Sequence, residues 1–458
     1  MLEANIIYIR LLLLIPTHLQ PAVTLLIGGV SAFLLAFILT FLVKAFCYKV
    51  GWLDKPAARR VHTKAVPRLG GVAIFLAFVI ASLLFYIPLF YTPDPNLNLH
   101  QNELTIFWLL IAAGGLMVIV HAYDDVLGLS PWIKLLAQTA AVIIILGPWI
   151  DQVFHGVLLF TFNNPFGVEH FNPNLPWYRE PTLFLVINKS AITLAAIPAV
   201  LLTWFWTVGM MNTVNWIDGM DGLASGVVGI TALFITLISF MLQQYSIAIL
   251  CAIFTGAIFG FLPHNWNPAK IFMGDSGSMF LGLGLAVLSI MGGAKLALAL
   301  MVLGVPILDV AVVIINRIRR RQSPVHYDKT HLHYRLMATG LSVKQICYLF
   351  YGLALVFGLL ALSFSGIHAA HFYKFVGIVL AFVTMAGLII WVDHRQRQRG
   401  VPIKLGGPEP EPKGGSEQHA GDYAHGSERA APSEYAAQAT PPQSPRSTDE
   451  YSRTPLPQ

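Results

Sequence analysis

The chain has 458 residues, of which 56% are apolar and only 11% are charged. Soluble globular proteins contain about 25% charged residues, so this composition excludes an ordinary soluble protein. The net charge of +6 does not indicate a nucleic-acid-binding protein, because the basic residues stand in short loops between apolar runs, where membrane topology and anionic lipid account for them. Cys47, Cys251 and Cys347 follow no spaced pattern and are expected to be reduced and buried.

Apolar runs of membrane-spanning length follow one another along the chain. A helix needs about 20 apolar residues to cross the hydrocarbon layer, and the alternating pattern of a membrane β-barrel is missing. The sequence therefore predicts an all-α polytopic membrane protein with about eleven transmembrane helices. They are expected at residues 22–46, 70–90, 104–122, 132–150, 191–211, 222–241, 246–263, 277–292, 294–316, 348–366 and 371–391.

The loops between these helices predict the orientation. Residues 47–69 and 317–345 are rich in Lys and Arg, whereas residues 91–103 and 242–245 contain neither. The positive-inside rule places the first two loops in the cytoplasm and the other two outside. With eleven helices, the N-terminus would lie outside and the C-terminus in the cytoplasm.

Three segments follow from this division. Residues 1–21 are expected to form an N-terminal interfacial segment, because the apolar run within them is too short to span and no signal-peptide cleavage pattern follows it. Residues 22–392 form the transmembrane domain, which carries the candidate catalytic residues described below. Residues 393–458 are predicted to be a disordered cytoplasmic tail, since Pro, Gly, Ser, Glu and Gln dominate it and cannot bury enough apolar surface.

The densest polar cluster is NTVNWIDGMDGLASG, residues 212–226. Asn212, Asn215, Asp218 and Asp221 recur there at steps of three, at the junction of two apolar runs. Ionisable side chains at the edge of a bilayer are costly and usually serve a ligand, an ion or a proton. The cluster therefore predicts a binding site. Polar packing between helices is the alternative.

Two further carboxylate motifs end or begin predicted helices. Asp124 and Asp125 are adjacent, and because adjacent helical side chains point about 100° apart, we expect them to have different roles. Like charges this close favour protonation of one member, which suits a proton acceptor. Asp275 stands between Gly274 and Ser276, where a carboxylate suits Mg²⁺ shared with phosphate oxygens. Helix-end solvation of the pair and an Asp-capped turn are the alternatives.

Two basic segments, residues 54–71 and 323–336, complete the set. Their candidate anion ligands are Lys64, Arg68, His331, His333 and Arg335. Contact with phosphate or sugar is favoured over a transition-metal pair of histidines, because no third metal ligand is evident. A positive-inside loop and a solvated basic loop are the respective alternatives.

The motifs PRLGG, DD, NxxNxxDGxDGL, PAKIFMGDSGS and DKTHLHYRL together resemble the polyprenyl-phosphate N-acetylhexosamine-1-phosphate transferases. This is glycosyltransferase family 4, which also contains the MurNAc-pentapeptide translocase. The resemblance runs from about Gly51 to about Leu341. The VPRLGG loop and the His-x-His segment look more like the GlcNAc-1-phosphate branch. That branch usually reads His-x-His-His, and here Tyr334 takes the last place.

The resemblance implies a reaction in which a lipid phosphate attacks the β-phosphorus of a UDP-sugar and UMP leaves. It also implies Mg²⁺ as the cofactor, with Mn²⁺ as the alternative, bound by Asp275 and Asp221. Asp124 or Asp125 would deprotonate or position the lipid phosphate. Direct attack is favoured over a covalent phospho-Asp intermediate.

The remaining roles and partners are also implied by the resemblance. Asn215, Asp218 and Asp221, with Asn212 beside them, would hold the nucleotide. The two histidines and the arginine of the second basic segment would contact sugar and phosphates. The expected partners are a UDP-HexNAc, most simply UDP-GlcNAc, and undecaprenyl or another polyprenyl phosphate.

The expected location is the bacterial cytoplasmic membrane, with the active site facing the cytoplasm and glycan synthesis for the cell envelope as the outcome. No nucleic acid is expected, and a homodimer is left open. An ion-coupled membrane transporter is the alternative function. Against it, the carboxylates gather at helix ends on one face and no internal repeat is evident.

Overall fold

The computed structural model describes most of the chain between residues 20 and 398. The described residues are 20–54, 65–91, 101–147, 149–150, 153–154, 156–159, 161–163, 182–184, 196–291, 295–319, 321, 331–365 and 370–398. They belong to one compact unit, Met1–Gly407. Nearly all of the predicted interfacial segment and the part of the predicted tail beyond Gln398 lie outside the described residues, as does Lys64.

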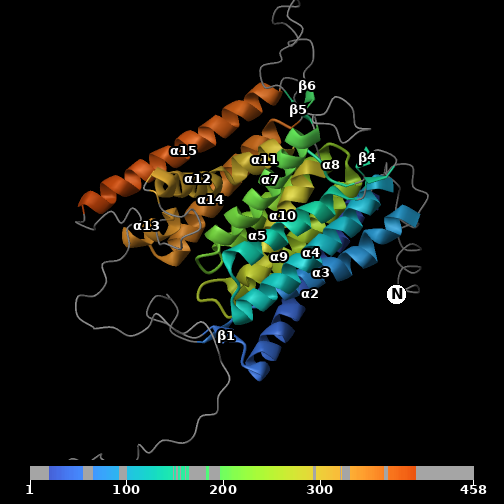
Figure 1. Ribbon diagram of the computed structural model, residues 1–458, viewed down its shortest axis with the longest axis horizontal. Coiled ribbons are helices and arrows are strands. Elements are labelled where there is room, and N and C mark those ends of the chain that lie inside the picture. Colours follow the sequence, from blue (N-terminus) through green and yellow to red (C-terminus); the bar gives the residue numbers. More distant parts are fainter. Residues whose placement is uncertain are drawn as a thin grey trace, which may run out of the picture. The chain divides into compact units, whose positions relative to one another are not determined.

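Helices make up almost all of the described chain (Figure 1). They are α2 (Gln20–Val50), α3 (Gly70–Phe85), the 3₁₀ helix η2 (Ile87–Tyr91), α4 (Gln101–Leu127), α5 (Pro131–Leu146), α7 (Ala196–Ile217), α8 (Leu223–Met241), α9 (Tyr245–Asn265), α10 (Gly274–Met291), α11 (Lys295–Val302), α12 (Gly304–Arg319), α13 (Leu332–Ala338), α14 (Val343–Ser363) and α15 (Ala370–Gln398).

Six short strands form three antiparallel pairs. Strand β1 (Leu53–Asp54) pairs with β2 (Val66–Pro67), β3 (Trp149–Ile150) with β4 (Val153–Phe154), and β5 (Thr161–Asn163) with β6 (Thr182–Phe184). The all-α class predicted from the apolar runs is therefore confirmed, with the strands confined to connections.

Nine helices of the described chain are long and apolar enough to cross a membrane, and each coincides with one of the eleven predicted spans. The other two predictions differ. The span predicted at 294–316 is broken into two helices bent by 76°, so it provides at most a tenth crossing. The span predicted at 132–150 corresponds to α5, whose 16 residues extend about 24 Å, less than the hydrocarbon thickness of about 30 Å.

The boundary predicted at the C-terminal side is also wrong. Helix α15 continues to Gln398, so the tail predicted to start at residue 393 starts too early. Polar residues fill the last turn of this helix, and hydropathy alone therefore ended it too soon.

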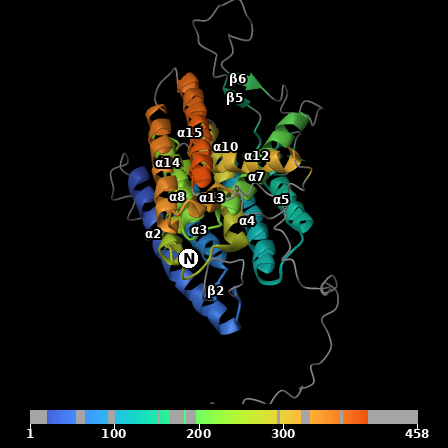
Figure 2. The same ribbon diagram turned by 90° about the vertical axis from the view of Figure 1, so that its left-hand side faces the viewer.

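Helices α12 to α15 gather on one side of the bundle, which lies at the left in Figure 1 and toward the viewer in Figure 2.

Helices α2 and α9 pack with their backbones close together because small residues line their contact. A β-carbon on Gly256 would lie 2.0 Å from the carbonyl oxygen of Gly29, and one on Gly260 would lie 2.2 Å from that of Phe33. Larger residues at these two positions would push the helices apart. Small residues at such contacts are the usual means of packing helices where lipid removes the hydrophobic driving force.

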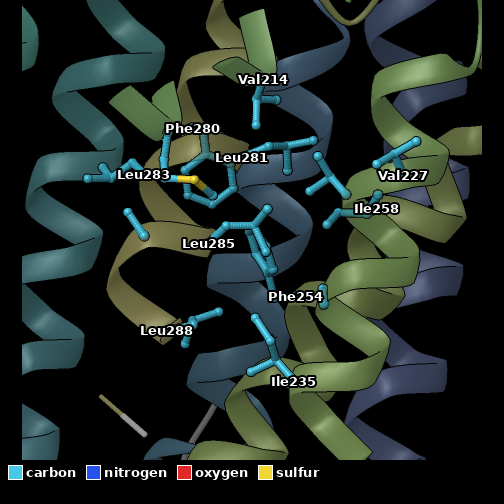
Figure 3. Packing of buried hydrophobic residues seen from close by; sticks show 14 of the residues in the cluster. Val214, Val227, Ile235, Phe254, Ile258, Phe280, Leu281, Leu283, Leu285 and Leu288 are labelled. Carbon is cyan, nitrogen blue, oxygen red and sulfur yellow. The ribbon is translucent and has the colours of Figure 1, made fainter. Parts of the chain in front are cut away.

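Helix α10 lies in the centre of the apolar core. Figure 3 shows Phe280 and Leu281 of α10 in one apolar cluster with Phe254 of α9, and Val227 of α8 beside Ile258 at its edge. The Phe280 ring lies 5.8 Å from that of Phe254 and 5.1 Å from that of Phe75 in α3, both in edge arrangements. Because α10 begins with the GDSGS motif, this packing fixes the position of the carboxylate of that motif.

Candidate active site

Asp125, near the end of α4, holds the start of α10. Its Oδ1 accepts a hydrogen bond from the backbone N–H of Asp275 (2.8 Å), and its Oδ2 accepts from the N–H (3.1 Å) and hydroxyl (2.9 Å) of Ser276. The first N–H groups of a helix lack intrahelical partners, and a carboxylate beside them is favourable. This geometry favours a positioning role for Asp125 over direct contact with substrate.

Lys134 of α5 links two of the predicted carboxylates. Its Nζ lies 2.5 Å from Oδ2 of Asp124 and 2.8 Å from Oδ2 of Asp275. Asp124 also accepts a hydrogen bond from the N–H of Leu129 at 2.6 Å. Because Asp124 is only 8% exposed, water screens its ion pair with Lys134 little. Sequence reasoning missed Lys134. Its one signal was a single charged residue in the apolar run of α5.

The two predicted amides have different neighbours. Asn215 donates from Nδ2 to Oδ1 of Asp275 (3.0 Å) and to the Ser278 hydroxyl (2.9 Å), so it orients the carboxylate of the GDSGS motif. Asn212, one turn earlier on α7, donates instead to Oε1 of Gln138 in α5 (2.9 Å). Asn212 therefore joins two helices and is not part of the carboxylate cluster.

The turn between α7 and α8 presents two carboxylates in different surroundings. Asp221 accepts through Oδ2 from Nδ2 of Asn267 (2.8 Å) and the N–H of Ala269 (3.0 Å). The carboxylate of Asp218 forms no hydrogen bond or ion pair with any residue that the structure describes. Burial and then the Asp275 carboxylate raise the pKa of Asp218 well above its ordinary value. Asp218 is thus a carboxylate of the cluster whose side chain has no direct partner among the described residues.

Asn265, at the end of α9, connects this turn to the GDSGS segment. Its Oδ1 accepts from the N–H of Gly222 and the hydroxyl of Ser225, both at 3.0 Å, and its Nδ2 donates to the carbonyl of Ile271 at 3.1 Å. Asn265 is 2% exposed. The two acidic motifs are therefore held in one fixed arrangement by a buried amide that sequence reasoning did not single out.

Arg68 reaches the cluster through backbone pairing. The N–H groups of Gly70 and Gly71 donate to the carbonyls of Phe272 (3.0 Å) and Met273 (2.9 Å). This places the PRLGG segment beside the start of α10. The Arg68 guanidinium lowers the pKa of Asp218, so it contributes positive charge to the cluster, while its predicted role as an anion ligand stays a prediction.

The His-x-His segment forms α13 and its N-cap. His331 contacts Oδ2 of Asp309 through Nδ1 (2.9 Å), and its ring lies 5.7 Å from that of Trp216 in α7. His333 stacks on His331 at 5.9 Å. Burial lowers the pKa of His333 to about 4, so its imidazole is neutral at pH 7. Sequence reasoning did not find Asp309, because it stands in an apolar helix far from the other motifs.

The other two residues of this segment have structural partners. Tyr334 donates its hydroxyl to the carbonyl of Gly219 (3.3 Å), in the turn that carries Asp218. Arg335 forms an ion pair with Asp393 of α15 and is only 8% exposed. The prediction that Arg335 contacts sugar or phosphate is therefore not supported by its position.

The cluster has an excess of negative charge. Asp124, Asp125, Asp218 and Asp275 lie near one lysine and one arginine. Carboxylate oxygens suit a hard divalent cation, and Mg²⁺ commonly takes one or two of them and completes its shell with water and phosphate. Within the described residues, no three His, Cys, Asp or Glu side chains form a ready metal site.

Asp275 and Asp218 are the side chains best placed to hold such a cation. Asp218 has no competing partner among the described residues, and it is close enough to Asp275 for each charge to affect the other. Asp221, the predicted second ligand, already accepts two hydrogen bonds through Oδ2. The structure therefore favours Asp218 over Asp221 as the companion of Asp275.

Comparison with known proteins agrees with this site. The sequence model described as glycosyl transferase family 4 matches residues 105–293, which include every carboxylate of the cluster. The probable undecaprenyl-phosphate N-acetylglucosaminyl 1-phosphate transferase of Bacillus subtilis is 32% identical over 75% of this chain and 86% of its own. The chain belongs to glycosyl transferase family 4. The resemblance inferred from the motifs is thus confirmed.

Other members of glycosyl transferase family 4 align over similar lengths. The decaprenyl-phosphate N-acetylglucosaminephosphotransferase of Mycolicibacterium smegmatis is 31% identical over 72% of this chain and 80% of its own. The phospho-N-acetylmuramoyl-pentapeptide-transferase of Staphylococcus aureus is 29% identical over 73% and 98%, respectively. The alignments span far more than the region of the family model, so the likeness extends over most of the helices.

Proposed function

We propose that this protein transfers HexNAc-1-phosphate, most simply GlcNAc-1-phosphate, from a UDP-sugar to undecaprenyl or another polyprenyl phosphate and releases UMP. The observation that carries the proposal is the cluster in which Lys134 joins Asp124 to Asp275 near Asp218, whose carboxylate has no direct partner among the described residues. Relatives named as transferases of this kind support the choice of substrates. The product would start the synthesis of a cell-envelope glycan.

The chemistry is one phosphoryl substitution. An oxygen of the lipid phosphate attacks the β-phosphorus of the UDP-sugar, and the bond from that phosphorus to the bridging oxygen breaks. The electron pair leaves with UMP, and the sugar is then joined to the lipid through a diphosphate. A phosphate monoester has its second pKa near 6, so the attacking group is mostly dianionic at pH 7 and needs no strong base.

The residues of the cluster supply position and charge to this reaction. Lys134 and Arg68 offer the positive charge that attracts the two phosphate-bearing substrates. Asp124 holds the Lys134 ammonium in place, while Asn215 and Asp125 fix the carboxylate and backbone of Asp275. Mg²⁺, held by Asp275 and Asp218, would neutralise charge that builds on the departing UMP.

The proposal includes a cytoplasmic active site in a bacterial cytoplasmic membrane, with the N-terminus outside and the C-terminus inside. Lys49 ends α2, and Arg317 and Arg319 end α12, so positive charge follows these helices on the proposed cytoplasmic side. An odd number of crossings puts the termini on opposite sides. Labelling of single cysteines placed in the 242–245 loop and at Lys344, in sealed right-side-out vesicles, tests this orientation.

A UMP-release assay on the purified protein tests the activity. We expect UMP only when the nucleotide sugar, undecaprenyl phosphate and Mg²⁺ are all present, with UDP-GlcNAc preferred among several UDP-sugars. Asp275→Asn should abolish release. Glu103→Gln is the matched control, because it removes a carboxylate at the opposite end of α4 from the site.

Two other outcomes would contradict the proposal. UMP release without lipid phosphate would indicate a hydrolase, and accumulation of a UDP-sugar in sealed vesicles without a lipid-linked product would indicate a transporter. The transporter alternative has no support from the relatives, which are named as transferases. A carboxylate cluster at the ends of helices also differs from the midplane sites common in transporters.

A further inference from the structure

Helix α13 lies directly against the turn that carries Asp218 and Asp221. The Tyr334 hydroxyl donates to the Gly219 carbonyl at 3.3 Å. A β-carbon on Gly219 would lie 2.5 Å from Nε2 of His333 and 2.8 Å from Oη of Tyr334, so only glycine allows this approach. Any movement of α13 would therefore displace the turn that carries Asp218 and Asp221.

Seven residues are too few for α13 to be stable on its own, because isolated helices in water need about 12–15 residues. Its place must be set by contacts with longer helices. One anchor is Asp309 of α12, which accepts from the N–H of Leu332 at 2.8 Å and contacts His331 at 2.9 Å. This anchor holds only the N-terminal end of α13.

The second anchor comes from the C-terminal end of α15. Asp393 forms an ion pair with Arg335, and Nε2 of Gln396 donates to the Arg335 carbonyl at 3.3 Å. Val392, beside them, is fully buried. Two contacts from one turn of α15 therefore hold the middle of α13, although the whole of α14 stands between the two helices in the sequence.

The contacts of Arg335 leave little of its guanidinium open to a substrate. The residue is 8% exposed, its Nη2 faces Asp393, and its Nε has no hydrogen-bond partner among the described residues. A guanidinium that served phosphate would need an open face toward the carboxylate cluster. The ion pair with Asp393 places the guanidinium on the α15 side of α13 instead.

We propose that Asp393 and Gln396 are positioning residues for the donor site: through Arg335 they hold α13 against the turn at Asp218 and Asp221. Arg335 then anchors α15 and does not bind substrate phosphate. This inference rests on the proposed function, since the donor site is the part of that function affected. The end of α15 would set the affinity for the UDP-sugar and leave the chemical step unchanged.

Steady-state kinetics of UMP release with four variants test the inference. Asp393→Asn and Arg335→Gln should each raise the KM for UDP-GlcNAc roughly tenfold, with kcat changed less than about twofold. The charge swap Arg335→Asp with Asp393→Arg should restore most of the lost affinity. Arg395→Gln, an exposed position on the same turn of α15, is the matched control and should behave as wild type.

Direct binding of substrate by Arg335 predicts a different pattern. Arg335→Gln would then impair the reaction while Asp393→Asn left KM unchanged, and the charge swap would rescue nothing. Either result overturns the inference.

Thermal unfolding in detergent provides a readout that does not depend on activity. A double-mutant cycle of Arg335→Gln and Asp393→Asn should show less destabilisation in the double variant than the sum of the two single variants. Additive effects would overturn the inference even if the charge swap failed to fold. Failure of the proposed function would appear separately, as absence of UMP release by the wild-type protein.

Discussion

The ammonium of Lys134 lies 2.8 Å from Oδ2 of Asp275, although 141 positions separate the two residues in the chain. The same ammonium contacts Asp124 at 2.5 Å, so one cation joins the ends of α4, α5 and α10. Arg68 is a second cation whose charge acts on the carboxylate cluster. Lys134 is therefore the residue most directly placed between the two carboxylates and an incoming phosphate.

Replacing Lys134 should cost most of the activity. Lys134→Met removes the counter-charge of two partly buried carboxylates and the cation nearest the proposed phosphate position, so kcat/KM for UMP release should fall about 100-fold or more. Lys134→Arg should retain part of the activity, because the charge remains but its geometry changes. Lys344→Met, at an exposed position near the start of α14, is the control. Unchanged kinetics of Lys134→Met would refute the assignment.

The response to Mg²⁺ should distinguish the two carboxylates of the α7–α8 turn. Asp218→Asn removes a carboxylate with no described partner, and the Mg²⁺ concentration for half-maximal UMP release should rise about tenfold or more. Asp221→Asn should change it less, since Oδ2 of Asp221 accepts hydrogen bonds from Asn267 and Ala269. EDTA should stop the reaction and added Mg²⁺ should restore it. The reverse order of the two variants would favour Asp221 as the ligand.

Asp125 should affect stability as much as activity. An amide nitrogen cannot accept the hydrogen bonds that Oδ2 receives from Ser276, so Asp125→Asn should destabilise the protein by about 1–3 kcal/mol. The readout is the apparent Tm in detergent, with Lys344→Met at an exposed position as the control. A large fall in kcat without any change in Tm would instead indicate that Asp125 acts on the substrate.

His333 should make the folded protein sensitive to acid. Its pKa of about 4 in the folded state is below the value near 6.5 of an unfolded histidine, so the unfolded chain binds the proton more tightly. The stabilisation is fully present above pH 6.5 and is lost as the pH falls toward 4, by about 3 kcal/mol at most. Unfolding of wild type and His333→Phe across this range measures it.

The difference in stability between the wild type and His333→Phe should change only at acid pH. The stability of the wild type relative to His333→Phe should decrease between pH 6.5 and 4 and stay constant from pH 7 to 8. A constant difference over the whole range would show that His333 is exposed to water in solution.

Much of the fold follows from local sequence because apolar length and apolar periodicity are local properties. Nine of the predicted spans match described helices for this reason. The predicted span at 294–316 consists of two helices bent by 76°, a break that hydropathy does not record. The helix at the predicted span 132–150 is shorter than predicted, because the apolar run continues past Leu146 whereas α5 is capped at Gly147 with a positive φ of 76°.

The candidate site was predictable where several polar residues stood together. Asp124, Asp125, Asp275 and the acidic turn at 218–221 were found because charge at the edge of a bilayer is costly. Lys134, Asp309 and Asn265 were missed, because each is a single polar residue whose partner stands in another helix. No local pattern distinguishes such a residue from a polar position on the surface of a helix.

The sequence by itself determined the membrane class, the family and the identity of the acidic motifs, because each depends on residue types at short spacing. Only the tertiary structure decided which contacts, and hence which role, each residue of these motifs has. It placed Asp125 on the backbone of α10, left Asp218 without a described partner and turned Arg335 toward Asp393. The physical reason is that the charge state and reach of a carboxylate or guanidinium depend on neighbours that the chain brings from distant helices.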